Sequence, residues 1–171
     1  MPSRETRDYA WLHAALTFGL FMSKDPSRKV GACVVGRNQR AVSFGYNGIV
    51  TGVEETPERW ERPTKYKLVR HAELNAILNA PFDVSGGILY CTLKPCHDCL
   101  GDALNAGIKS VVWLHDPEPF IMQDEDTWNL FAQQFDNLIE YPRLAITNDI
   151  ISKYKEMQER NEEDGTILDN E

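Results

Sequence analysis

The chain has 171 residues, 42% of them hydrophobic, and a formal net charge of -8 at pH 7. This length suits one domain, residues 1–160, followed by an acidic tail, 161–171, that is expected to be flexible. A negative charge without a long basic run argues against nucleic acid as substrate or partner, because proteins that hold polynucleotides usually carry a basic face. No window approaches the roughly 18 consecutive apolar residues of a membrane span, and positions 1–8 lack the apolar core of a signal peptide. We therefore expect a cytoplasmic protein without a membrane partner.

The predicted elements alternate between helices and short strands. They are, in order, a helix over 9–23, strands over 30–35 and 41–46, a helix over 72–80, a strand over 88–93, a helix over 97–106, a strand over 110–114, a helix over 126–134, a strand over 138–141 and a helix over 145–160. The strand-helix-strand order favours an α/β layered domain with parallel neighbours. Residues 47–69 form a long connection, and loops of this length in compact domains are usually functional or disordered, so we treat it as a candidate binding loop.

Two short segments carry candidate metal chemistry, His71-Ala72-Glu73 and a Pro-Cys-His-Asp-Cys run at 95–99. His71, Cys96 and Cys99 supply three ligands, and the two cysteines would share one face of a helix that starts after the proline. A catalytic zinc takes three protein ligands and leaves one position open, whereas a structural zinc takes four. Glu73 would then be a non-ligating carboxylate that moves protons. The pattern predicts one catalytic zinc per chain.

Plainer interpretations of the cysteines exist, because a C-x-x-C pair alone fits a redox pair or half of a structural zinc site. Neither explains the His-x-Glu segment. A structural site would need a fourth ligand, and the candidates for it are Cys33, Cys91, His13, His97 and His115. Cys33 and Cys91 lie in apolar, strand-like runs, where a free cysteine usually behaves as a small buried hydrophobe.

Four segments in order give a resemblance to a known family: Asp-Pro-Ser-Arg-Lys-Val-Gly-Ala at 25–32, Gly-Tyr-Asn-Gly at 45–48, and the two metal segments. With them the chain resembles deoxycytidylate deaminases, and among these the phage and viral members. The resemblance implies a cytidine deaminase-like three-layer α/β/α fold with a central five-stranded mixed sheet. It also implies hydrolytic deamination of dCMP to dUMP and ammonia, feeding dTMP synthesis, by a homo-oligomer that is commonly a hexamer, in the host cytoplasm if the protein is viral.

The resemblance also implies substrate contacts. Asn47 would hydrogen-bond the deoxyribose, although Tyr-Asn-Gly is also a strong turn sequence. The base would be lined, through backbone groups, by Ala72, Thr92, Leu93 and Pro95. Candidates for the 5'-phosphate are Ser27, Arg28 and Lys29, because a guanidinium and a hydroxyl suit phosphate oxygens. The alternative for these three is a solvated turn.

Members of this family are often activated by dCTP and inhibited by dTTP at a second nucleotide site. By resemblance, this site would involve Gly45, Asn47, Gly48, Gly52, Trp60 and Arg62, with Mg2+ as a bridging ion for the triphosphate. The alternative is a loop that only supports a subunit interface.

Three rival functions remain: a deaminase with dCTP as an additional substrate, a related deaminase acting on tRNA adenosine or guanine, and a non-catalytic nucleotide-binding protein. The acidic charge and the Gly-Tyr-Asn-Gly segment argue against the second. Glu73 argues against the third, because a purely structural metal has no use for a carboxylate beside an open coordination position.

Overall fold

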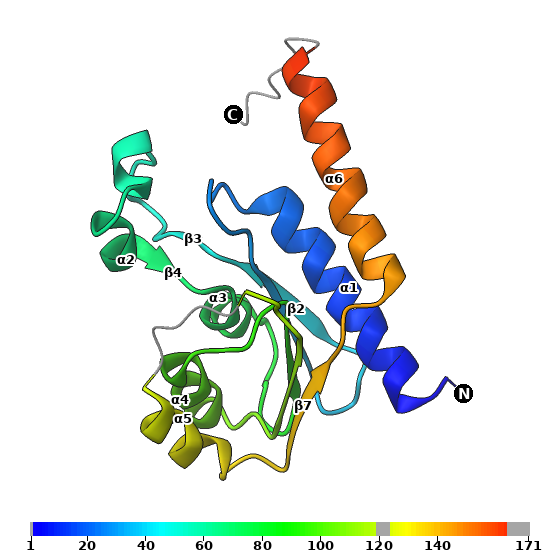
Figure 1. Cartoon of the computed structure of the whole chain (residues 1–171). Coiled ribbons are helices and arrows are strands. Elements are labelled where there is room, and N and C mark those ends of the chain that lie inside the picture. Colours follow the sequence, from blue (N-terminus) through cyan, green and yellow to red (C-terminus); the bar gives the residue numbers. More distant parts are fainter. Residues whose placement is uncertain (1, 119–123, 164–171) are drawn as a thin grey trace.

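Helices cover both faces of a central mixed sheet (Figure 1). The structure is a computed structural model and describes residues 2–118 and 124–163. Over these residues the elements are α1 (Arg4–Met22), β1 (Gly31–Val35), β2 (Val42–Tyr46), β3 (Gly48–Ile49), a 3-10 helix η1 (Pro57–Trp60), α2 (Thr64–Leu68), β4 (Val69–Arg70), α3 (Ala72–Leu78), β5 (Ile88–Cys91), α4 (His97–Asn105), β6 (Ser110–Leu114), α5 (Glu125–Ala132), β7 (Asn137–Tyr141) and α6 (Ala145–Glu163).

The central sheet has the strand order β2-β1-β5-β6-β7. β1 pairs antiparallel with β2 and with β5, whereas β5, β6 and β7 run parallel. Helices α4 and α5 connect the parallel strands, so the predicted strand-helix-strand alternation is confirmed. The expected three-layer α/β/α fold with a five-stranded mixed sheet is likewise confirmed over the described residues. The parallel strands end at one edge of the sheet, and the cysteine segment starts there, after β5.

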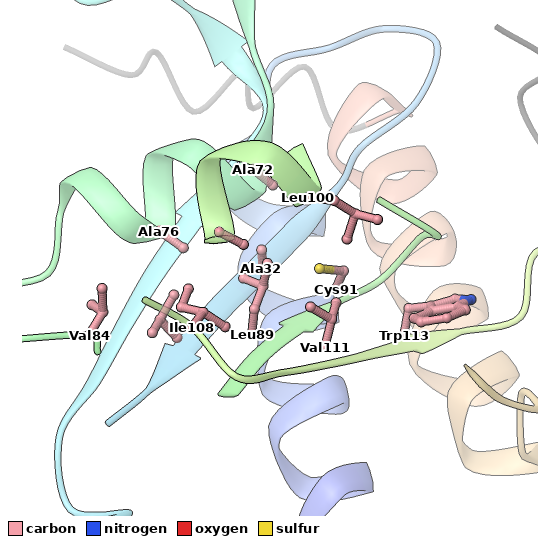
Figure 2. Packing of buried hydrophobic residues seen from close by; sticks show 12 residues of the cluster. Ala32, Ala72, Ala76, Val84, Leu89, Cys91, Leu100, Ile108, Val111 and Trp113 are labelled. Atoms are coloured by element: carbon pink, nitrogen blue, oxygen red, sulfur yellow. The ribbon is translucent and has the colours of Figure 1, made fainter. Parts of the chain in front are cut away.

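Alternate residues of β1 contribute to two separate cores. Ala32 and Val34 lie in a cluster with Leu100 and other residues of α3 and α4 (Figure 2). Cys33 and Val35 lie on the opposite side of the sheet, in a cluster with residues of α1. All five residues of β1 are therefore buried, as expected for a central strand that helices cover on both faces.

Cys33 and Cys91 are both fully buried, at 0% exposure each. Burial raises the pKa of both thiols, so they stay neutral. The prediction that both side chains are buried is confirmed.

Residues 47–69 contain more regular structure than the expected loop. β3 pairs antiparallel with β4, with Gly48 opposite Arg70 and Ile49 opposite Val69, and this ribbon closes the base of the connection. η1 and α2 lie between the two strands. These short elements were not predicted, because elements of two to five residues are too short to show a periodic apolar pattern.

Both ends of the described chain are helical. α1 begins at Arg4, five residues before the predicted start at 9, because Ser3 caps it with a side-chain oxygen that accepts from the Thr6 amide at 3.1 Å. α6 runs to Glu163, so the first three residues of the predicted tail are helical; the rest of the tail, 164–171, lies outside the described residues. No helix in the described ranges is long and apolar enough to span a membrane.

Helix α3 packs closely on β2 at Gly45. A Cβ atom at this position would lie 2.2 Å from the carbonyl oxygen of Ala72 and 2.2 Å from the amide nitrogen of Ala76. Both contacts are with backbone atoms, which cannot rotate away. Only glycine therefore permits this distance between helix and strand.

We predict that Gly45→Ala pushes α3 away from the sheet and lowers the free energy of unfolding by about 1–3 kcal/mol, the usual cost of overpacking. Denaturant titration followed by circular dichroism measures this change. Gly48→Ala is the matched control, because a Cβ there meets only the Tyr46 ring, at 3.4 Å. Equal stability of the two variants would contradict the prediction.

Candidate active site

Two helices begin near one point and bring the three predicted ligands together. His71 is the N-cap of α3, Cys96 is the N-cap of α4, and Cys99 lies in the first turn of α4. Nδ1 of His71 is 3.3 Å from Sγ of Cys99 and 3.5 Å from Sγ of Cys96, and the three ligand atoms lie within 4.8 Å of one another. One nitrogen and two sulfurs in this arrangement fit a single Zn2+, whose bonds to them are about 2.0–2.3 Å long.

The charge state of Cys96 suits a metal ligand. Hydrogen bonds from Cys99 and from His71 outweigh burial and lower the pKa of Cys96 to about 4. His71 and Cys99 each form a hydrogen bond with Cys96. The bond from His71 raises the pKa of His71 to about 9, and the bond from Cys99 raises the pKa of Cys99. Cys96 is therefore a thiolate at neutral pH, which is the form that binds zinc.

Glu73 lies in the first turn of α3 and is only 4% exposed. Burial raises the pKa of its carboxyl, and the charge of His71 acts in the opposite direction. Glu73 lines the same cavity as His71 and Cys96. The structure thus brings a buried carboxyl to the ligand group, as the His-x-Glu spacing predicted, whereas its catalytic role stays a prediction.

A cavity of about 580 Å3 opens beside the ligand group. Its volume falls in the range of roughly 300–1,000 Å3 that is typical of small-molecule sites. The other walls come from the loop between α1 and β1, from Asn47 and from α2. A larger cavity of about 1470 Å3 lies at the opposite edge of the sheet, where β5, β6 and β7 begin, and its lining includes neither His71 nor Cys96.

Asn47 lines this cavity, but its side chain is already fully hydrogen-bonded within the protein. Its Oδ1 accepts from the Ser23 hydroxyl and from the Val30 amide, both at 2.8 Å. Its Nδ2 donates to Asp25 Oδ2 and to the Arg28 carbonyl, both at 2.9 Å. These four bonds use the two donors and two acceptor positions of the amide. A contact with the deoxyribose would require one of them to open.

The structure separates the three phosphate candidates. Ser27 and Arg28 line the cavity that also contains Glu73. Lys29 does not point into it: its Nζ donates to the Ser23 carbonyl and lies 6.0 Å from the centre of the Tyr154 ring. Two of the three predicted residues are therefore in a position to meet a ligand.

The four residues expected around the base also divide into two groups. Ala72 and Leu93 line the cavity. Thr92 instead ties the end of β5 to β1, because its Oγ1 accepts from the Gly31 amide and its own amide donates to the Gly31 carbonyl, both at 3.0 Å. Pro95 is fully buried, and its carbonyl accepts a hydrogen bond from a side chain of α5. Thr92 and Pro95 therefore support the wall from behind.

Residues 5–115 match the family model described as the cytidine and deoxycytidylate deaminase zinc-binding region. This stretch is more than half of the 171-residue chain and contains all three ligands and Glu73. The chain belongs to this family.

Relatives of this deaminase domain include the deoxycytidylate deaminase of Mus musculus, which is 44% identical over 101 residues, or 55% of this chain and 57% of the mouse protein. The probable deoxycytidylate deaminase of Drosophila melanogaster is 34% identical over 134 residues, or 71% of this chain and 64% of the fly protein. The chain thus spans less than two thirds of the length of these relatives.

Among solved structures, the dCMP deaminase of cyanophage S-TIM5 is similar to this domain. It superimposes with a TM-score of 0.62 at 25% identity, covering 82% of this chain and all of the phage chain. The same values hold for the phage enzyme in complex with dCMP and dUMP.

The residues predicted for a second nucleotide site come from several elements of this domain. Arg62 and Asn47 line the cavity beside the ligand group. Gly45 lies beneath α3, and Gly48 starts β3. Gly52 has a positive φ of 89°, which glycine adopts readily, and Trp60 ends η1.

Several residues of the site escaped sequence reasoning. Lys65 and Tyr66 of α2 line the cavity, and Trp128 of α5 donates from Nε1 to the Pro95 carbonyl at 2.9 Å. Lys94 lies 4.1 Å above the Trp128 ring. α5 lies far from the metal segments in sequence, and α2, which ends at Leu68 just before β4 and His71, carries no recognisable ligand motif, so sequence reasoning did not indicate these contacts.

Trp128 fixes the peptide that directly precedes Cys96, so it should affect metal binding. We predict that Trp128→Phe weakens zinc affinity by roughly 10-fold, the usual lower bound for losing an outer hydrogen bond of a metal site. Competition with a chromophoric chelator measures this affinity. Trp11→Phe is the control, because Trp11 of α1 packs against the other core cluster, together with Cys33 and Val35. Unchanged affinity in Trp128→Phe would show that the ligand loop holds its shape without this bond.

Proposed function

We propose that this domain catalyses the hydrolytic deamination of dCMP to dUMP and ammonia. The observation that carries the proposal is the group of His71, Cys96 and Cys99 beside buried Glu73, at a cavity that Arg28 also lines. The cavity volume of about 580 Å3 suits a ligand of the size of a nucleotide. The names of the mouse and fly relatives and the dCMP and dUMP bound to the phage enzyme support the same substrate.

The three metal ligands and Glu73 would have separate roles in this reaction. When bound to the three ligands, Zn2+ would act as a Lewis acid and bring the pKa of water to about 7. Glu73 would accept a proton from the water that attacks C4 and pass it to N3. It would then accept the proton of the new C4 hydroxyl and pass it to the leaving amine. Because Glu73 is buried, bulk water does not compete for these protons.

Arg28 would bind the 5'-phosphate. Its Nη1 lies 3.1 Å from Asp116 Oδ2, and its Nη2 donates to the Glu118 carbonyl at 2.8 Å. A guanidinium has five N-H donors, more than these contacts with the described residues use. Asp116 and Glu118 therefore orient the side chain and leave donors for phosphate oxygens. The Ala72 and Leu93 backbone would face the base.

We predict that Glu73→Gln keeps one zinc per chain and lowers dCMP turnover by roughly 100-fold or more, because glutamine cannot transfer the proton. Uracil formation from dCMP, dCTP, deoxycytidine and CMP is measured for each variant, together with metal content. Glu159→Gln, on the exposed face of α6, is the control. Turnover by Glu73→Gln at the wild-type rate would overturn the catalytic assignment. Turnover of dCTP would add a second substrate, and no turnover of any cytosine nucleotide would favour another base or a binding role.

Regulation by triphosphates is a further part of the proposal, with dCTP as activator, dTTP as inhibitor and Mg2+ bridging the phosphates. Support for it comes from the resemblance and from residues 50–68, which carry Arg62 and Tyr66 at the cavity wall. We predict that dTTP with Mg2+ lowers dCMP turnover and that dCTP raises it. A rate and a melting temperature that neither nucleotide changes would contradict this.

We further propose an oligomeric state, a cellular location and a metabolic role for this enzyme. A cytoplasmic homo-oligomer, hexameric as in the family, would supply dUMP for dTMP synthesis. Large apolar side chains at the surface of this chain support assembly, since Leu78 of α3 is 70% exposed and Leu130 of α5 is 59% exposed.

A further inference from the structure

A buried ion pair joins α2 to the loop between α1 and β1. Lys65 Nζ lies 2.7 Å from both carboxylate oxygens of Asp25, across 40 positions of the sequence. Lys65 is 9% exposed and Asp25 is 2% exposed. Lys65 is also the buried residue of α2, so this pair holds the short helix against the cavity.

The Asp25 carboxylate organises the loop that follows it. Its Oδ1 accepts from the Ser27 amide and the Ser27 hydroxyl, both at 2.9 Å, and from the Arg28 amide at 3.1 Å. Its Oδ2 accepts from Asn47 Nδ2 at 2.9 Å. The backbone direction at Arg28 is therefore set by Asp25.

Asp25 needs its partner to remain charged there. Burial alone raises the pKa of Asp25, but the hydrogen bonds from Lys65, Ser27 and Arg28 together hold it below the ordinary value. A buried carboxylate that lost the ammonium would be an uncompensated charge, which is strongly unfavourable. The loop conformation thus depends on Lys65.

Lys65 has no donor left for a ligand. Its ammonium has three N-H groups, and three acceptors surround it: the two Asp25 oxygens and the Ser27 hydroxyl at 2.6 Å. Ser27 in turn donates to Asp25, so its hydroxyl proton is also engaged. Asp25, Ser27 and Lys65 line the cavity as well, but their polar groups are engaged with one another, so the Arg28 guanidinium is the group of this cluster with donors left for a phosphate.

We propose that Lys65 and Asp25 are positioning residues that give the cavity its preference for a 5'-phosphate, by holding Arg28 in the wall of the cavity that His71 and Cys96 also line. The inference rests on the proposed function, since the phosphate is that of the proposed substrate. Neither residue touches the reacting atoms. Their loss should therefore weaken phosphate recognition without slowing the chemical step.

The test compares substrates with and without the phosphate. In Lys65→Met and Asp25→Asn, kcat/KM for dCMP should fall about 10- to 100-fold, through KM, the scale expected when a binding group shifts by about 1 Å. The value for deoxycytidine should stay within about twofold. Lys67→Met, on an exposed side of the same helix, is the matched control and should keep the wild-type preference. Folded, zinc-loaded variants with an unchanged ratio of dCMP to deoxycytidine would overturn the inference.

A second measurement separates this inference from the deaminase proposal. Calorimetry gives the affinity for dUMP and for deoxyuridine, which needs no turnover. The double variant Asp25→Asn/Lys65→Met removes both buried charges, so it serves if a single variant fails to fold, and it too should lose the preference for dUMP. If wild-type protein binds dUMP more tightly than deoxyuridine but does not deaminate dCMP, the inference holds and the proposed reaction is wrong. Wild-type protein that binds both equally would overturn the inference.

Discussion

The site depends on two helix starts that meet at one edge of the sheet. β5 ends at Cys91, and the short segment after it delivers Cys96 and the first turn of α4. α3 begins after His71, whose Nδ1 lies within 3.5 Å of both ligand sulfurs. Three ligands from two separate segments can meet only if both helices keep their positions on the sheet. The packing of α3 and α4 on one face is therefore a requirement for bringing the three ligands and Glu73 together.

Small residues make this packing possible. α3 approaches β2 over Gly45, and on the other face α1 approaches β1 where Gly19 meets Gly31. A Cβ on Gly31 would lie 1.8 Å from the Ala15 carbonyl, so α1 could not reach its present depth with a larger residue there. The sheet is thus held at a fixed distance from helices on both faces. Gly45 was predicted to belong to a nucleotide-binding loop; in the structure it allows α3 to pack closely on β2.

The cavity wall around Asp25 has a different physical basis. It is built from buried polar groups, and Asp25 at its centre is satisfied by Lys65, Ser27, Arg28 and Asn47. Such a network is rigid only when every member has its partner. In the proposed function, a nucleotide would contact metal ligands that apolar packing holds in place and a cavity wall that hydrogen bonds hold in place. The metal ligands could be predicted because they lie in two short sequence segments. The wall around Asp25 could be predicted only in part, because it depends on hydrogen bonds between distant segments.

The sequence by itself determined the ligand group, Glu73 and most of the helices and strands. Cys96 and Cys99 share a helical turn, and Glu73 follows His71 by two positions, so local geometry fixes their relation. The tertiary structure decided which polar side chains reach the cavity. Lys29 turns away to Tyr154, whereas Lys65 reaches Asp25 across 40 positions and Trp128 reaches Pro95 across 33. The reason is that periodicity and spacing encode local backbone geometry, while hydrogen bonds between distant segments depend on how those segments pack.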